Sequence, residues 1–192
     1  MKRMLFVMNP YAGQRKANRH LAEILNVFNR AGYEVTACMT AGPRDAENIV
    51  AEKAGQVDVI VCAGGDGTFN EAVNGVMKSG AKTPIGYIPC GSTNDFASSL
   101  RLSSNVVQAA QDIVDGSPEH YDVGTFNNRY FSYVASFGAF TRTSYSTPQS
   151  VKNALGHTAY LLSSVQELSQ LRKEHLLIET DDRIIEDDFV FG

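Results

Sequence analysis

The stretch VDVIVCAGGDGTFNE, residues 57–71, decides the fold, because an apolar run passes through a glycine turn and then opens a helix. A junction of this kind builds a phosphate site, since the first N–H groups and the positive end of the helix dipole face the turn. Gly64, Gly65 and Gly67 are expected to take positive φ angles, which let backbone N–H groups approach a ligand closely. The stretch therefore predicts an anion site, with a nucleotide phosphate as its natural occupant.

Three polar residues of the same stretch refine this prediction. Thr68 and Glu71 have the spacing of a capping box, which predicts a helix that begins near Thr68. Asp66 would repel a phosphate unless a divalent cation lay between them, so it is interpreted as a contact to Mg²⁺-nucleotide. The alternative is an ordinary link between a strand and a helix, because Gly-Asp-Gly is common turn chemistry.

Composition narrows the class of protein. The 192 residues, 43% of them hydrophobic, are enough for one large domain or two small ones with a real core. A net charge of −4 with scattered cations argues against nucleic acid as a partner. Three cysteines, no signal segment and no apolar run long enough to span a membrane favour a reduced, cytoplasmic setting. The four histidines lack metal-ligand spacing.

Strands and helices alternate through the first 120 residues. Apolar runs predict strands at 4–8, 33–39, 57–63 and 85–88, and helical spacing predicts helices near 21–28, 46–54, 68–78 and 106–114. The pattern predicts a parallel sheet covered by helices on both faces, with ligands at the carboxyl ends of the strands. Loops 9–13, 64–68 and 89–95 follow three of these strands and are expected to converge.

The third loop resembles the second in design. Gly91 permits a tight turn, and Ser92 or Thr93 is expected to cap the following helix. Asn94 and Asp95 would then point toward the shared crevice. Taken alone, this loop is a capped helix start; beside the other two loops it favours a site.

The pattern of predicted elements changes near residue 120, where the alternation of strands and helices ends. Residues 121–135 predict a hairpin about an Asn-Asn turn, residues 151–172 predict a helix, and residues 175–190 predict a second hairpin. We therefore expect two domains, residues 1–120 of α/β type and residues 121–192 of β type. The second domain is expected to be incomplete, with exposed strand edges or a mobile final hairpin, because two hairpins and one helix are marginal alone.

Together these motifs resemble the diacylglycerol kinase catalytic domain family, in particular its soluble bacterial lipid kinases. The resemblance covers nearly the whole chain, and Gly-Gly-Asp-Gly-Thr alone is shared with NAD kinases. It is carried by Asn9-Pro10-x-Ala12-Gly13, Gly64-Gly65-Asp66-Gly67-Thr68-x-Asn70-Glu71, Gly91-Ser92-Thr93-Asn94-Asp95-Phe96-Ala97, Tyr121-Asp122-Val123-Gly124, Asn128-Arg129-Tyr130-Phe131 and Leu155-Gly156-His157-Thr158-Ala159-Tyr160.

The resemblance implies a nucleotide domain like that of NAD kinase and phosphofructokinase, followed by a β-sandwich and a cleft between them. ATP with Mg²⁺ would phosphorylate a lipid hydroxyl, most simply that of diacylglycerol, at the membrane surface. By motif, Asp66 matches the essential aspartate of the glycine loop, and Asp95 and Asp122 match an acidic pair bridged by a cation. The implied cofactor-binding residues are Asn9, Pro10, Gly13, Gly64, Gly65, Gly67, Thr68, Glu71, Gly91, Ser92, Thr93 and Asn94.

Two departures from the family pattern leave alternatives open. Gln14 stands where relatives can carry the bridging lysine, so the cation would be Arg15 or Lys16. Family members are longer, and the general base is expected outside this chain, which could leave the chain inactive alone. An NAD kinase-like enzyme and a non-catalytic nucleotide-binding fragment remain the competing functions. Peripheral membrane contact and a homodimer are further expectations.

Overall fold

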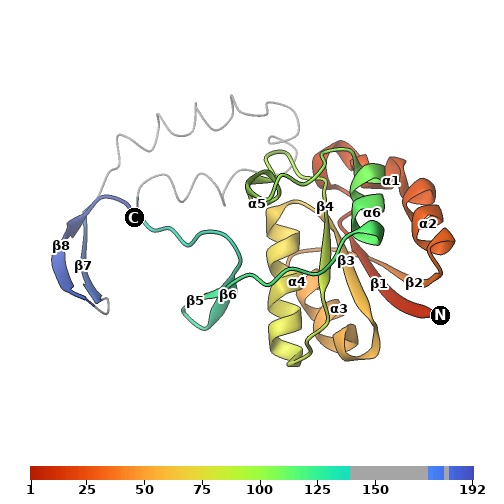
Figure 1. The fold of residues 1–192 in the computed structure, drawn as a ribbon. Coiled ribbons are helices and arrows are strands. Elements are labelled where there is room, and N and C mark those ends of the chain that lie inside the picture. Colours follow the sequence, from red (N-terminus) through yellow and green to blue (C-terminus); the bar gives the residue numbers. More distant parts are fainter. Residues whose placement is uncertain (139–172, 180–181) are drawn as a thin grey trace. The chain divides into compact units, whose positions relative to one another are not determined.

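The structure is a computed structural model that describes residues 1–138, 173–179 and 182–192 (Figure 1). It contains two compact units, Met1–Tyr133 and Val134–Gly192. The first unit holds the expected α/β domain and also the hairpin that the sequence analysis assigned to the second domain. The functional boundary at residue 120 stays a prediction.

A parallel sheet of four strands forms the centre of the first unit. Its order is β2-β1-β3-β4, and every neighbouring pair is parallel. Met8 pairs with Ala63, and Gly64 pairs with Pro89, so the carboxyl ends of three strands lie level. This confirms the predicted parallel sheet. The strands are β1 (Lys2–Met8), β2 (Tyr33–Met39), β3 (Val59–Gly64) and β4 (Ile85–Pro89).

Helices cover both faces of the sheet, as predicted (Figure 1). Side chains of β1 alternate between two buried clusters, since successive strand residues point to opposite faces. Met4, Phe6 and Met8 join one cluster, and Leu5 and Val7 join the other. The first cluster includes α2 (Leu21–Arg30) and α6 (Val106–Asp115), and the second includes α3 (Asp45–Lys53), α4 (Asp66–Ser79) and α5 (Asp95–Ser99). The short elements α1 (Lys16–Arg19), η1 (Ala12–Arg15) and η2 (Ala54–Gln56) complete this unit's helices.

The remaining described strands form two antiparallel pairs. In the first unit, β5 (Gly124–Phe126) pairs with β6 (Arg129–Phe131) across a turn in which Asn127 and Asn128 have positive φ. In the second unit, β7 (Glu174–Glu179) pairs with β8 (Ile184–Phe189). Both predicted hairpins are thus confirmed. The predicted helix at 151–172, with its Leu-Gly-His-Thr-Ala-Tyr motif, lies outside the described residues.

No helix among the described residues has the length and apolarity that crossing a bilayer requires.

Helices α3 and α4 pack closely because Gly75 has no side chain. A Cβ added there would lie 2.6 Å from the Glu47 carbonyl oxygen and 2.7 Å from the Val50 Cβ. Both neighbours are buried and one is backbone, so neither has room to move.

Gly75→Ala should therefore lower the free energy of unfolding by about 1–3 kcal/mol, the usual cost of overpacking a core. Chemical denaturation measures this. Gly55→Ala is the matched control, because its added Cβ has no neighbour within 4 Å. A Gly75→Ala protein as stable as the control would contradict the packing account.

Candidate functional site

Three loops meet at the carboxyl edge of the sheet, as predicted. The Asn9 N–H donates to the Ala63 carbonyl oxygen at 2.9 Å, and the Cys90 N–H donates to the Gly64 carbonyl oxygen at 2.7 Å. The Asn9 side chain accepts from the Tyr11 N–H at 3.0 Å, which folds the first loop over the strand end. Pro10, between them, is half-buried. The loops are thus joined through backbone before any ligand is considered.

Glycines allow the three loops to touch. Gly13 has a φ of +48°, and a Cβ there would lie 1.8 Å from the Cys90 carbonyl oxygen. A Cβ on Gly65 would meet the Gly91 Cα at 3.2 Å, and one on Gly91 would meet the Gly65 Cα at 2.7 Å. The first loop therefore packs on the third, and the third packs on the second, with no side chain between them.

The expected positive φ angles in the second loop are wrong. Gly65 has φ −90° and ψ −179°, and neither Gly64 nor Gly67 has positive φ. The chain passes straight from the extended end of β3 into α4, so no left-handed residue is needed. Gly64 is required for space instead, since a Cβ there would lie 2.6 Å from the Thr68 Cβ. Gly67 faces open space.

The predicted capping box is wrong as well. Helix α4 begins at Asp66, two residues early, and no side chain caps it. The Thr68 hydroxyl accepts a long hydrogen bond, 3.4 Å, from the Asn9 amide, and the Glu71 carboxylate accepts from the Arg44 N–H at 2.9 Å. Because its first turn has no side-chain acceptor, the N-terminus of α4 keeps the donors that bind anions.

Asp66 is bound by the third loop. Its carboxylate accepts hydrogen bonds from the backbone N–H of Asp95 at 2.9 Å and of Phe96 at 3.3 Å. The Tyr87 hydroxyl lies 3.5 Å away and donates toward it. Burial, reinforced by the Asp66 charge, raises the pKa of Tyr87, which keeps this hydroxyl protonated as a donor. Asp66 thus caps α5 while remaining half-buried at the edge of the sheet.

A stack of aromatic rings that includes Tyr87 was not foreseen from the sequence. The Phe69 ring stacks on Tyr87 at 4.4 Å and on Phe96 at 5.1 Å between centroids. The three rings come from α4, β4 and α5, so they fix the two motif helices against the sheet. The available signal was a phenylalanine shortly after each motif aspartate, three residues after Asp66 and one after Asp95.

The third loop is shaped by Asn94 rather than by its hydroxyl residues. Asn94 is left-handed, with φ 55°, and no side chain caps α5 from the N-cap position. Its amide accepts from the Gly91 N–H at 2.7 Å and donates to the Gly91 carbonyl oxygen at 2.9 Å. Ser92 and Thr93 are exposed. The prediction that one of them caps the helix is wrong, because Asp66 supplies the acceptor across the edge.

The two remaining acidic candidates are exposed and close to one aromatic contact. Asp95 precedes Phe96, whose ring meets the ring of Tyr121 edge-on at 6.5 Å; Asp122 follows Tyr121. The two candidate cations have other neighbours here. The Arg15 guanidinium lies over the Tyr11 ring at 5.7 Å, and the Lys16 ammonium donates to the Ser104 carbonyl oxygen.

Within the described part of the chain, no cluster of three or more His, Cys, Asp or Glu side chains could hold a metal by itself. The thiol of Cys90 is inert in this edge, because burial raises its pKa to about 12. The edge therefore offers backbone donors, one carboxylate and glycine surfaces. That combination defines an α/β protein whose sheet carries an edge built from three loops, with an uncapped helix N-terminus beside close-packed glycines.

Comparison with known proteins narrows that class. The family model of the diacylglycerol kinase catalytic domain matches residues 3–126, and the chain belongs to this family. The diacylglycerol kinase of Bacillus subtilis is 36% identical over 188 residues, 97% of this chain and 62% of the relative. That of Staphylococcus epidermidis is 37% identical over 187 residues, 96% and 59% of the two chains. The chain thus spans about 60% of the length of these relatives.

Solved structures agree with the fold. A crystal structure of a diacylglycerol kinase from Bacillus anthracis str. Sterne matches with a TM-score of 0.78 at 27% identity, covering 99% of this chain and 62% of the other. A second structure from that organism reaches a TM-score of 0.82 at 28% identity, covering 99% and 63%.

The glycine contacts predict a graded response to added methyl groups. Gly13→Ala should be severe, because the methyl group would overlap a carbonyl oxygen and the left-handed backbone adds roughly 1–2 kcal/mol of strain. Gly65→Ala should be milder, because its neighbour need shift only slightly. Thermal unfolding and binding of a fluorescent ATP analogue measure both effects. Equal losses in the two variants would contradict the backbone-contact account.

The bonds to Asp66 predict a structural cost in addition to any chemical one. Asp66→Ala should lower the free energy of unfolding by about 1 kcal/mol, as removal of a helix cap does, and should speed hydrogen exchange at the Asp95 and Phe96 amides. Asp45→Ala is the control, because Asp45 accepts a similar loop bond from the Ala41 N–H at 2.7 Å, remote in sequence from the three loops. Unchanged exchange at Asp95 and Phe96 would show that Asp66 does not hold the third loop.

Proposed function

We propose that this chain provides the nucleotide side and part of the acceptor side of an ATP-dependent lipid kinase, which transfers the γ-phosphate to the hydroxyl of diacylglycerol. Membership of the diacylglycerol kinase catalytic domain family supports the reaction. The observation that carries the proposal is the three-loop edge, where an uncapped helix N-terminus lies beside close-packed glycines.

The nucleotide phosphates would lie against the start of α4. The first-turn N–H groups of α4 carry no side-chain cap, and Gly67 leaves open space where a side chain would stand. Asn9 and Asn94 would act indirectly, since each holds its loop in place through hydrogen bonds. The proposed binding set is Asn9, Pro10, Gly13, Gly64, Gly65, Gly67, Thr68, Gly91, Ser92, Thr93 and Asn94. Glu71, included from the motif, has its carboxylate at the start of α3 and would support the helix.

Mg²⁺ fits this edge as a companion of the nucleotide. Mg²⁺ commonly uses one or two carboxylates together with substrate phosphates and water, so a cage of several acidic residues is not required. Asp66 accepts backbone and hydroxyl bonds but a carboxylate has about four acceptor positions, which leaves room for a cation. When bound, the metal would neutralise charge on the transferring phosphoryl group.

The acceptor side would be organised by Asp95 and Asp122. Both carboxylates are exposed, and their sequence neighbours Phe96 and Tyr121 touch. A cation shared by the pair would come from Arg15 or Lys16, after their side chains leave the Tyr11 ring and the Ser104 carbonyl. Phosphoryl transfer asks mainly for positioning and charge stabilisation, which this pair would supply for the lipid hydroxyl.

The same proposal covers domain roles and location. Residues 1–120 would bind nucleotide, and residues 121–192 would begin the lipid-binding part. The protein would work in the cytoplasm at the membrane surface, where diacylglycerol is reached by peripheral contact, and a homodimer is compatible with it.

The direct test offers labelled ATP and Mg²⁺ with either diacylglycerol in mixed micelles or NAD as acceptor. It is run on this chain and, where the natural reading frame continues past Gly192, on the longer form. Label in phosphatidic acid supports the proposal. Label in NADP, or nucleotide binding without transfer in either form, would replace it by an NAD kinase or a binding module.

Asp95→Asn and Asp122→Asn should each lower kcat by about 10²-fold, the scale of a misplaced reactant, with little change in ATP affinity. The double variant decides whether they act together. If the two carboxylates share one cation, the combined loss should be smaller than the product of the single losses. Strictly multiplicative losses would mean that the two residues act independently.

A further inference from the structure

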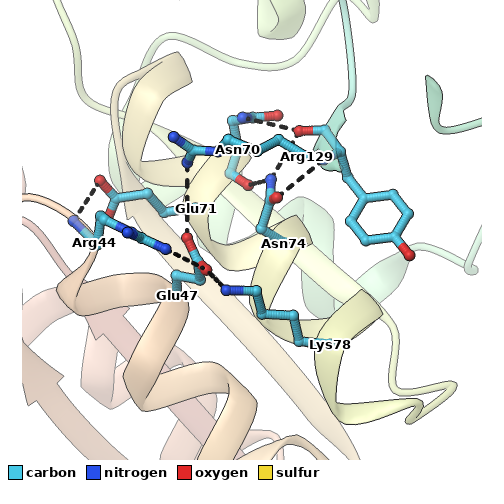
Figure 2. Close-up of polar contacts among 8 residues, drawn as sticks. Arg44, Glu47, Asn70, Glu71, Asn74, Lys78 and Arg129 are labelled. Atoms are coloured by element: carbon cyan, nitrogen blue, oxygen red, sulfur yellow. Dashed lines mark hydrogen bonds and ion pairs between the residues drawn. The ribbon is translucent and has the colours of Figure 1, made fainter. Parts of the chain in front are cut away.

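We infer that Asn70 and Asn74 are positioning residues that fix the β5–β6 hairpin, and with it Asp122, relative to the three-loop edge. We call their side chains, which Figure 2 shows on α4, together with the backbone of Tyr130 and Ser132, the asparagine clamp. The inference rests on the proposed function for its catalytic consequence, and its structural part stands without it.

Asn74 makes the central contacts of the clamp. Its amide donates to the Tyr130 carbonyl oxygen at 2.8 Å, and its side-chain oxygen accepts from the Tyr130 N–H at 3.0 Å. The same amide donates to the Asn70 carbonyl oxygen at 2.8 Å. Only 2% of Asn74 is exposed. One buried side chain therefore satisfies both backbone groups of a strand residue, as a neighbouring strand would.

Asn70 extends the contact to Ser132, one residue past the end of β6. Its amide donates to the Tyr130 carbonyl oxygen at 3.3 Å, and its side-chain oxygen accepts from the Ser132 N–H at 3.2 Å. Asn70 and Asn74 are four residues apart, so they lie on one face of α4. The N–H groups of Tyr130 and Ser132 both donate to side chains of α4, so the contact runs along one edge of β6 and just past its end. Helix α4 thus forms hydrogen bonds with the outer edge of the hairpin.

An ion pair holds the start of β6 to the neighbouring helix. The Arg129 guanidinium lies 3.7 Å from Oε2 of Glu47, an oxygen that has no hydrogen-bond partner among the described residues. Glu47 also pairs with Lys78 and with Arg44 (Figure 2), and its side chain is only 2% exposed. Burial alone would raise the pKa of Glu47, but hydrogen bonds and charge from Lys78 and Arg44 lower it, so a carboxylate faces Arg129.

The flanks of the hairpin are held at a second place. The rings of Tyr121, before β5, and Tyr133, after β6, both contact Phe96, at 6.5 Å and 6.1 Å between centroids. Phe96 belongs to α5, whose first turn is bound by Asp66. Asp66 in turn begins α4. The hairpin is therefore attached to α5 through Tyr121 and to α4 through Tyr130. Asp122 lies between these two residues in the sequence.

A purely structural role would need less specific chemistry. Asparagine is a poor helix former, and apolar side chains would bury the same helix face at lower cost. Asn74 and Asn70 instead match the donors and acceptors of one particular strand edge. The positioning role and the structural role make different predictions for a variant that keeps the size of the side chain.

Asn74→Asp is that variant, because it replaces the amide donor by a carboxylate oxygen beside two carbonyl oxygens. Hydrogen exchange should become at least about tenfold faster at Tyr130, Ser132 and the segment 121–126, while β3 keeps its protection. ATP affinity should stay within about twofold, and kcat for diacylglycerol should fall by about 10²-fold, the scale of a misplaced reactant. Asn48→Asp, at an exposed position on α3, is the matched control and should change nothing.

Arg129→Met guards against an unfolded first variant, because the Arg129 side chain is 57% exposed and Glu47 keeps its pairs with Arg44 and Lys78. It should show faster hydrogen exchange in the hairpin and unchanged ATP affinity, as Asn74→Asp does, with a smaller fall in kcat than that variant. Unchanged hairpin exchange in both variants would overturn the inference. Losses of ATP affinity and kcat in parallel with melting temperature would reduce the clamp to a structural contact.

The two proposals fail in different ways. If the parent protein phosphorylates no lipid, the proposed function fails, and hairpin exchange measured beside ATP affinity still decides whether the clamp positions residues 121–126. If the parent is active and the variants keep full kcat with a loosened hairpin, the proposed function survives and the positioning role is wrong.

Discussion

The three-loop edge depends on contacts between backbones that leave no space for a side chain. The Cys90 carbonyl oxygen stands where a Cβ of Gly13 would be, and the Cα atoms of Gly65 and Gly91 approach each other directly. Close packing of this kind tolerates no added atoms without displacement of one loop. Each loop's position therefore fixes the next, and the edge behaves as one piece rather than three flexible connections.

The carboxylate of Asp66 is stabilised at this edge because the protein supplies hydrogen-bond donors to it. Two backbone N–H groups and the Tyr87 hydroxyl are directed at the carboxylate. Hydrogen bonds from N–H groups to an ionised acceptor are stronger than neutral ones, so the third loop is held firmly. The same residue thereby opens α4 and anchors α5, and it accepts from Tyr87, a member of the aromatic stack with Phe69 and Phe96.

The sequence predicted the layers of this fold well and the details of its edge poorly. Alternating apolar residues such as Leu5 and Phe6 belong to two faces whatever the distant chain does, so local periodicity suffices for strands and helices. Thr68 and Glu71 have capping-box spacing, yet Asn9 and Arg44 contact them instead. Those partners are remote in sequence, and a local pattern carries no information about them. The sequence correctly indicates that Gly64 and Gly65 belong to a loop that needs glycine. Close contacts, rather than positive φ angles, are the reason.

The contact between α4 and the hairpin also fixes one position, here through hydrogen bonds rather than close packing. Apolar side chains between a helix and a strand would permit a shift of one residue, and such a slip turns every strand side chain to the opposite face. Hydrogen bonds to the N–H and carbonyl groups of Tyr130 permit only one register. The ion pair of Arg129 with the buried Glu47 is weak evidence of added stability, because desolvation of the carboxylate offsets much of the attraction. Helix α4 thus begins in the glycine loop and binds the hairpin through Asn70 and Asn74, one and two turns later, so that a single helix links the three-loop edge to the hairpin.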